Sequence, residues 1–264
     1  MKLSRHWRRR APTLFLARTS SSWPQGMPSF WFVQARSSFL PYDFFLLILG
    51  IFFLYCMQTG GPSWEVFLGR RDSLTASLED SNDIMPSPRA NATALIQLFK
   101  RFGLSVKDMV ALSGSHTIGK ARCFSIVHRL YNQSGTGEAD PTIELRYKKY
   151  LDKLCPQSGD GNVTGNLDAT PTVFDNQYFK DLVKGRGFLN SDEVLFSTGG
   201  ETRQLVELFS KNQTAFFSSF TTSMINLGNL FSSHSLHCGE IRRDCRRVNS
   251  RTAAPPELLM PDVD

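Results

Sequence analysis

The stretch that decides the fold is Leu104–Cys123, LSVKDMVALSGSHTIGKARC, because several independent signals in it converge on one histidine, His116. Ser105 and Asp108 have the spacing of a capping box, which predicts that a helix begins here. An apolar stripe follows inside that helix, formed by Met109, Val110 and Leu112. The stripe predicts that the helix packs into a core and carries the histidine at its far end.

Two glycines, Gly114 and Gly119, bracket this histidine. A glycine just past the last helical turn lets the backbone turn sharply, so we expect the imidazole at a helix end where another group can approach it. A single histidine is more often a surface or core residue than a ligand, but the run VALSGSHTIGKARC resembles the proximal-haem sequence of the secretory plant haem peroxidases (class III, the horseradish peroxidase type). The resemblance implies that His116 is the axial ligand of the iron of haem b.

The composition is that of a globular chain with a basic leader. With 264 residues and 41% apolar content, it can bury one substantial core, or one domain with accessory segments. The net charge of +6 is unevenly placed, because residues 1–40 hold seven basic residues and no acid. A basic leader on a nearly neutral body is typical of targeting information. Since no motif interleaves aromatic and basic residues, nucleic acid is excluded as the expected partner.

Residues 1–58 read as this leader followed by an apolar segment, and they resemble nothing in the family. Phe44–Met57, FFLLILGIFFLYCM, is a continuous apolar run, shorter than the roughly twenty residues that a membrane-spanning helix needs. It is compatible with a cleaved signal peptide, with a signal anchor that keeps the body outside the cytosol, or with a buried helix. These three interpretations stay open.

The cysteines and glycosylation sequons indicate the secretory pathway. Five cysteines without a CxxC pair favour disulfides over a zinc site. Asn-x-Ser/Thr sequons begin at Asn91, Asn132, Asn162 and Asn212. Four sequons are more than chance comfortably supplies, so we expect a secreted glycoprotein, extracellular or vacuolar, with membrane anchoring through 44–57 as the alternative. We expect a monomer.

The family resemblance begins abruptly at Gly60, with GGPSWEVFLGRRDS, and covers about residues 60–250. It implies a mostly α-helical, haem-peroxidase-like domain over 59–250 that contains the proximal part of the fold and lacks the distal helices. Residues 251–264, rich in proline and ending in acids, read as a flexible tail. Apolar residues at helical spacing predict further helices over 91–102, 124–131, 143–154 and 201–225.

The resemblance also implies a Cys123–Cys155 disulfide and a calcium site. The run Asn166–Asp175, NLDATPTVFD, offers the hard oxygen ligands that calcium prefers, although such a cluster alone is usually only a polar loop. The implied ligands are Thr117, Asp168, Thr170, Val173 through its backbone carbonyl, and Asp175. Only Ala169 separates Asp168 from Thr170, where many relatives have two residues, and this departure bears on Asp168 more than on Asp175.

Two other positions match functional residues of the family. Asp192 matches the aspartate that accepts a hydrogen bond from the axial histidine, which fixes its tautomer and pushes electron density toward the iron. Alone, Ser191-Asp192 is also typical of a helix cap. Pro86, in Asp83–Pro88, matches the residue whose carbonyl helps bind aromatic donors, and a plain proline-rich turn fits these residues equally well.

The resemblance implies reduction of hydrogen peroxide with one-electron oxidation of phenolic donors, in oxidative-stress response and peroxide catabolism. In the family, an Arg and a His in an R-x-x-F-H-D-C motif perform the acid–base work on peroxide. This sequence contains no FHDC, so no catalytic residue is identified. The alternative is a catalytically impaired haem-binding remnant, or a mis-predicted, N-terminally truncated or replaced chain.

Overall fold

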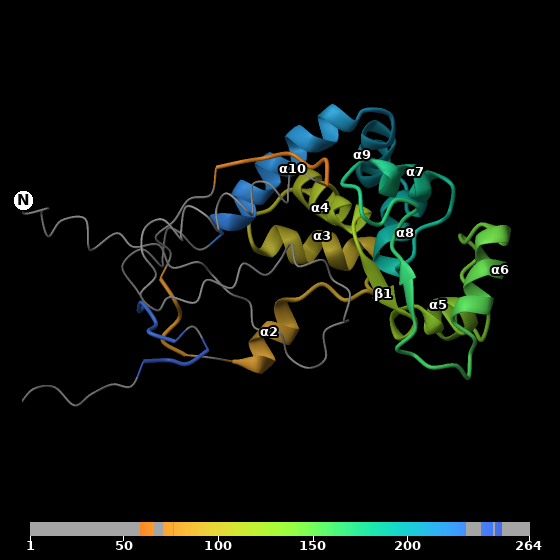
Figure 1. Ribbon diagram of the computed structural model, residues 1–264, viewed down its shortest axis with the longest axis horizontal. Coiled ribbons are helices and arrows are strands. Elements are labelled where there is room, and N and C mark those ends of the chain that lie inside the picture. Colours follow the sequence, from red (N-terminus) through yellow and green to blue (C-terminus); the bar gives the residue numbers. More distant parts are fainter. Residues whose placement is uncertain (1–58, 66–70, 76, 231–238, 245, 250–264) are drawn as a thin grey trace, which may run out of the picture.

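The computed structural model describes residues 59–65, 71–75, 77–230, 239–244 and 246–249 (Figure 1). The α-helices are α2 (Leu78–Ile84), α3 (Ala92–Arg101), α4 (Val106–Ser113), α5 (Val127–Tyr131), α6 (Leu145–Leu154), α7 (Gln177–Val183), α8 (Asn190–Ser197), α9 (Gly200–Lys211) and α10 (Gln213–Gly228). Three 3₁₀ turns lie among them: η3 (Gly114–Thr117), η4 (Cys123–Ser125) and η5 (Gln133–Gly135). Strands β1 (Lys120–Arg122) and β2 (Thr164–Asn166) form a two-stranded antiparallel sheet. The expected mostly α-helical fold is confirmed.

Helix α4 lies at the centre of the larger core, with α10 on one side and α3 on the other (Figure 1). Its predicted capping box is present, because the Asp108 N–H donates to Ser105 Oγ at 3.0 Å and the Ser105 N–H donates to the Asp108 carboxylate at 2.9 Å. The other carboxylate oxygen of Asp108 accepts from Ser223 and Asn226 of α10, at 2.8 and 3.0 Å. One side chain therefore both starts α4 and fastens it to α10.

Aromatic rings fill the space between α4, α7, α9 and α10. Five buried phenylalanines pack against one another, mostly edge to face: Phe174, Phe179, Phe209, Phe216 and Phe220. A second, smaller core lies around the sheet, α5 and α6. The larger core holds the helix that leads into His116, and the smaller one holds the chain that leaves it.

The glycine before His116 acts differently from the expectation. Gly114 has ordinary helical angles, φ −60° and ψ −11°, so it supplies no sharp turn. A Cβ placed there would lie 2.5 Å from the Phe216 ring and 2.7 Å from the Phe179 ring. Gly114 is therefore needed for close packing, and Gly119, with φ +104°, is the glycine at which the backbone takes a left-handed conformation.

Several predicted helix boundaries are wrong. The helix expected over 201–225 is two helices, because Asn212 takes an extended conformation and its side chain caps α10 by accepting from the Ala215 N–H at 2.9 Å. Leu208 of α9 is 46% exposed. The helix expected over 124–131 is η4 followed by the shorter α5, and the one expected over 143–154 begins at Leu145. The helix over 91–102 is confirmed as α3, which Asn91 caps by accepting from the Ala94 N–H.

The N-terminal part of the described chain meets the C-terminal part through one antiparallel bridge. The Asp72 N–H donates to the Glu240 carbonyl at 2.8 Å, and the Glu240 N–H donates back to the Asp72 carbonyl at 2.9 Å. The predicted leader over 1–58, including 44–57, and the predicted tail over 251–264 lie outside the described residues. Among the helices that the structure describes, none combines the length and the apolarity needed to cross a membrane.

Candidate functional site

His116 lies in η3, directly after α4, and its side chain is 28% exposed. The turn holds it between the two cores, with Thr117 behind it fully buried. Its ring Nδ1 lies 2.9 Å from Oδ1 of Asp192, which is buried in the first turn of α8. The pair therefore joins two helices far apart in the sequence.

The same carboxylate oxygen has a second donor that the sequence did not reveal. The hydroxyl of Tyr178, a buried residue of α7, donates to Asp192 Oδ1 at 3.0 Å. Burial and the neighbouring Asp192 raise the pKa of Tyr178 well above its ordinary value, so the phenol keeps its proton and remains a donor. Tyr178 and His116 therefore share one oxygen of Asp192. The hydrogen bond from Tyr178 weakens the effect of the Asp192 negative charge on the imidazole.

The electrostatics fix the tautomer of His116. Burial alone would lower the pKa of His116, but the Asp192 carboxylate outweighs it and raises that pKa above the ordinary value. With Nδ1–H bound to Asp192, the neutral ring presents the lone pair of Nε2. Nε2 makes no hydrogen bond within the part of the chain that the structure describes, and the exposed part of the side chain makes it accessible.

These features fit a haem ligand. An imidazole that binds iron through Nε2 needs that nitrogen free and its Nδ1–H held by an acceptor. His116 meets both requirements. Asp192 accepts from its Nδ1–H, and Tyr178 bonds the same carboxylate and packs against the imidazole ring edge to face.

The predicted calcium residues gather behind His116. The hydroxyl of Thr117 donates to Asp168 at 2.8 Å and lies 3.2 Å from Asp175. The hydroxyl oxygen of Thr170 lies 3.2 Å from each carboxylate oxygen of Asp175 and 3.4 Å from Oδ2 of Asp168. Val173 lies in the turn between them, where its N–H donates to the Thr170 carbonyl at 2.9 Å. The carboxylates of Asp168 and Asp175 and the hydroxyls of Thr117 and Thr170 thus form one cluster despite the short Asp168–Thr170 spacing.

The two carboxylates of this cluster repel each other. Burial raises the pKa of Asp168 to about 6, opposed by hydrogen bonds from Thr117 and Thr170 and supported by the charges of Asp175 and Asp181. A buried carboxylate with a raised pKa is held without enough positive charge, which suits a cation. No group of three His, Cys, Asp or Glu side chains arranged to hold a metal occurs among the described residues, so any ion here would depend on hydroxyl and carbonyl oxygens as well.

Pro86 lies on the surface, just beyond α2. The loop expected over 83–88 begins inside this helix, because Asp83 and Ile84 form its last residues. The loop and His116 come together through α8, whose Ser191 N–H donates to the Pro88 carbonyl at 3.1 Å.

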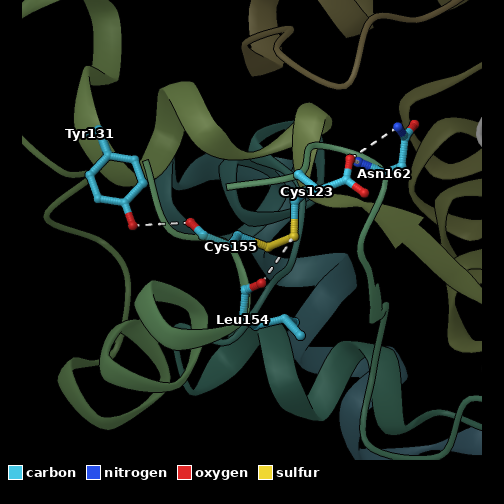
Figure 2. The surroundings of a disulfide bond; sticks show 6 residues. Cys123, Tyr131, Leu154, Cys155 and Asn162 are labelled. Atoms are coloured by element: carbon cyan, nitrogen blue, oxygen red, sulfur yellow. Dashed lines mark hydrogen bonds between the residues drawn. A yellow bond between two sulfur atoms is a disulfide. The ribbon is translucent and has the colours of Figure 1, made fainter. Parts of the chain in front are cut away.

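The Cys123–Cys155 disulfide is present, as the resemblance implied, with a Cα–Cα distance of 5.3 Å (Figure 2). Both cysteines are 1% exposed. The Tyr131 hydroxyl donates to the Cys155 carbonyl at 3.0 Å, and Cys123 Sγ lies 3.6 Å from the Leu154 carbonyl oxygen. The bridge joins the chain leaving the sheet to the end of α6.

A buried ionic network next to Asp192 was also missed. Arg129 of α5 is fully buried; its Nε donates to Asp140 at 2.7 Å, and its guanidinium bonds the Gly187 carbonyl and lies 3.7 Å from Glu193. Glu193 accepts the Gly187 N–H at 2.9 Å, and burial raises its pKa to about 7, partly offset by Arg129. An arginine within the apolar run IVHRL is the only sequence signal, and it does not identify the partners.

Comparisons with known proteins identify the family. A family model described as Peroxidase matches residues 54–212. Peroxidase 17 of Arabidopsis thaliana is 67% identical over 202 residues, which are 76% of this chain and 59% of that protein. Peroxidase 72 of Arabidopsis thaliana is 51% identical over 192 residues, 72% of this chain and 57% of that protein. Peroxidase 15 of Ipomoea batatas is 52% identical over 192 residues, 72% of this chain and 58% of that protein.

The chain thus spans less than two thirds of the length of these relatives. The family match nevertheless includes His116, Asp192, both bridged cysteines and the whole candidate calcium cluster. The chain belongs to the haem peroxidase family and is related to the secretory class III peroxidases of plants.

Proposed function

We propose that this chain supplies the proximal side of a haem peroxidase that reduces hydrogen peroxide and oxidises phenolic donors by one electron at a time. The observation that carries the proposal is the His116–Asp192–Tyr178 arrangement. It leaves Nε2 of the imidazole accessible while Nδ1 is bound to Asp192. Haem, when bound, supplies the iron that takes electrons from the donor and passes them to peroxide.

Each residue of this side has a separate role. His116 would hold the iron through Nε2, while Asp192 keeps the proton on Nδ1 and would make the imidazole a stronger donor of electron density. Tyr178 moderates that effect by donating to the same oxygen. The second candidate function is a haem-binding remnant with little peroxidase activity, in which the same histidine and aspartate would hold haem.

A haemin titration of the 264-residue chain tests the proposal. We expect a saturable Soret band in the wild type and its loss in His116→Ala, because His128, the other imidazole among the described residues, lacks this arrangement. Asp192→Asn should keep the band but weaken the Fe–His bond, visible as a lower Fe–His stretching frequency by resonance Raman spectroscopy. Addition of peroxide then separates the candidates: turnover of a phenol such as guaiacol supports the peroxidase, and haem binding without turnover supports the remnant.

His128→Ala is the matched control, since this second histidine of the described chain lies in α5 and is half-buried. It should leave the Soret band unchanged. A band that survives His116→Ala, or one that disappears equally in His128→Ala, would contradict the ligand assignment.

We further propose that Thr117, Asp168, Thr170, Val173 and Asp175 hold calcium directly behind His116. An ion there would fix the backbone of Thr117 and so the orientation of the imidazole beside it. The repulsion between the buried Asp168 carboxylate and the half-buried Asp175 carboxylate supports this assignment.

Calcium affinity should depend on pH through Asp168. Its pKa of about 6 in the metal-free protein means that protons compete with the ion below that pH. We expect calcium to bind about tenfold more weakly at pH 5 than at pH 7.5, measured by isothermal titration calorimetry. Asp168→Asn should bind weakly at both pH values and lose this dependence. Equal affinity of the wild type at the two pH values would contradict the raised pKa of Asp168, and unchanged affinity in Asp168→Asn would show that Asp168 is not a ligand.

We propose that the chain enters the secretory pathway and is glycosylated. All four sequon asparagines are exposed. At Asn212 the side-chain Oδ1 caps α10, whereas a glycan attaches to Nδ2, so capping and glycosylation are compatible. Plant-expressed protein should carry a glycan at this position.

Two substitutions separate these roles of Asn212. Asn212→Ala should remove both the glycan and the cap, and lower the free energy of unfolding of unglycosylated protein by about 1 kcal/mol. Thr214→Ala should remove only the glycan and leave that free energy nearly unchanged. Mass spectrometry of plant-expressed protein and urea unfolding of bacterial protein measure the two effects. Equal unfolding free energies of the two variants would argue against the capping role.

A further inference from the structure

A short strap, residues 86–90, is tied to the beginning of α8 by three consecutive carbonyl groups. The Pro88 carbonyl accepts the backbone N–H of Ser191 at 3.1 Å. The Arg89 and Ala90 carbonyls both accept from Nδ2 of the Asn190 side chain, at 3.2 and 3.0 Å. The strap is therefore held by one helix turn.

Asn190 uses its whole amide group in this role. Its Oδ1 accepts from Gln133 Nε2 at 2.9 Å, and the residue is 5% exposed. An aspartate has the same shape but cannot donate, so it would place a carboxylate opposite two carbonyl oxygens. Position 190 therefore requires an amide side chain, which can donate to the strap carbonyls and accept from Gln133 at the same time.

The helix turn that holds the strap also holds the imidazole. Asp192, two residues after Asn190, accepts from His116 Nδ1 at 2.9 Å. On the strap, Pro86 is exposed, and the Arg89 guanidinium lies 5.7 Å from the centre of the exposed Phe124 ring. The first turn of α8 thus fixes the position of the strap, which lies beside the exposed Phe124 ring, relative to His116, the candidate iron ligand.

We propose that Asn190 is a positioning residue that fixes the strap relative to His116 and thereby determines the affinity for phenolic donors. This inference rests on the proposed function, because it takes phenolic donors as the substrates. It places them at the strap, where Pro86 and the Phe124 ring are exposed. Asn190 would act without contacting the donor or haem. Its effect reaches the donor through the backbone of residues 88–90, so it should change donor binding and strap order while leaving haem binding unchanged.

The test compares Asn190→Asp with Gln133→Met in the full 264-residue chain. The first change removes both donors to the strap, whereas the second removes only the hydrogen bond to Asn190 Oδ1. Three quantities are measured for each: hydrogen–deuterium exchange of the peptide covering residues 86–91, the haemin dissociation constant, and the phenol dissociation constant of the haem-loaded chain by difference absorbance. Asn190→Ser is a milder variant that replaces Asn190→Asp if the latter does not fold.

We expect Asn190→Asp to exchange at least tenfold faster in the strap and to bind phenol at least fivefold more weakly, with haemin affinity within twofold of the wild type. Gln133→Met should remain close to the wild type in all three. Unchanged strap exchange, unchanged phenol affinity, or a parallel loss of haemin affinity would each overturn the proposal. If wild-type holoprotein binds no phenol, the donor part of the proposed function fails and this inference falls with it, while the exchange data still report whether Asn190 anchors the strap.

Discussion

Arg129→Met is expected to lower the free energy of unfolding by about 3–5 kcal/mol, the typical cost of removing one partner from a buried ion pair. The substitution leaves Asp140 and Glu193, which are 6% and 2% exposed, without their cation. It also removes the donor to the carbonyls of Gly187 and Phe188, which lead into α8. Because small domains have total stabilities of about 5–15 kcal/mol, the variant should be close to unfolded at 37 °C.

Urea unfolding at pH 7.5, followed by circular dichroism, measures this loss. Arg129→Lys is the matched control, because it keeps the charge but cannot bond Asp140 and the Gly187 carbonyl together, and an intermediate loss is expected. Adding Asp140→Asn and Glu193→Gln to Arg129→Met should recover part of the stability, since it removes the unpaired charges. A loss below about 1 kcal/mol in Arg129→Met would mean that water or rearrangement satisfies the two acids.

Replacing both bridged cysteines by serine is expected to lower the free energy of unfolding by about 3.7 kcal/mol on the chain-entropy model. Cys123 and Cys155 are separated by 32 positions, so the bond constrains a substantial loop of the unfolded chain. Both are buried in the smaller core, and two serine hydroxyls there would also need hydrogen-bond partners.

Urea unfolding of the double variant, with and without dithiothreitol, measures the contribution of the bond. Reductant should destabilise the wild type and leave the Cys123→Ser/Cys155→Ser variant unchanged. Equal effects of reductant on the two proteins would show that the stabilisation comes from elsewhere.

Local signals in the sequence predicted the structure around His116 well. The capping box of Ser105 and Asp108 and the apolar stripe behind it depend on neighbours a few positions apart, and these are the interactions that sequence spacing reveals. The Asp192 and Cys155 partners, much farther along the chain, came only from the family resemblance, because no periodicity links such distant residues.

The errors share a physical cause. Asn212 looked like one polar residue inside a long helix, yet its side chain is better used as a cap, which divides that helix into two. Gly114 looked like a turn residue, whereas the Phe216 and Phe179 rings exclude a side chain there. Arg129 and Tyr178 were not recognised because their importance comes from partners that only the folded chain brings near.

The first turn of α8 explains why this region should accept substitutions more readily than changes in length. Asn190, Asp192 and Glu193 reach three different parts of the chain from one turn: the strap, the imidazole and the buried arginine. One residue inserted between Asn190 and Asp192 would turn Asp192 and Glu193 by about 100° around the helix axis relative to Asn190, so the three side chains could no longer all meet their partners. The spacing of these three residues is therefore as much a part of the site as the identity of any one of them.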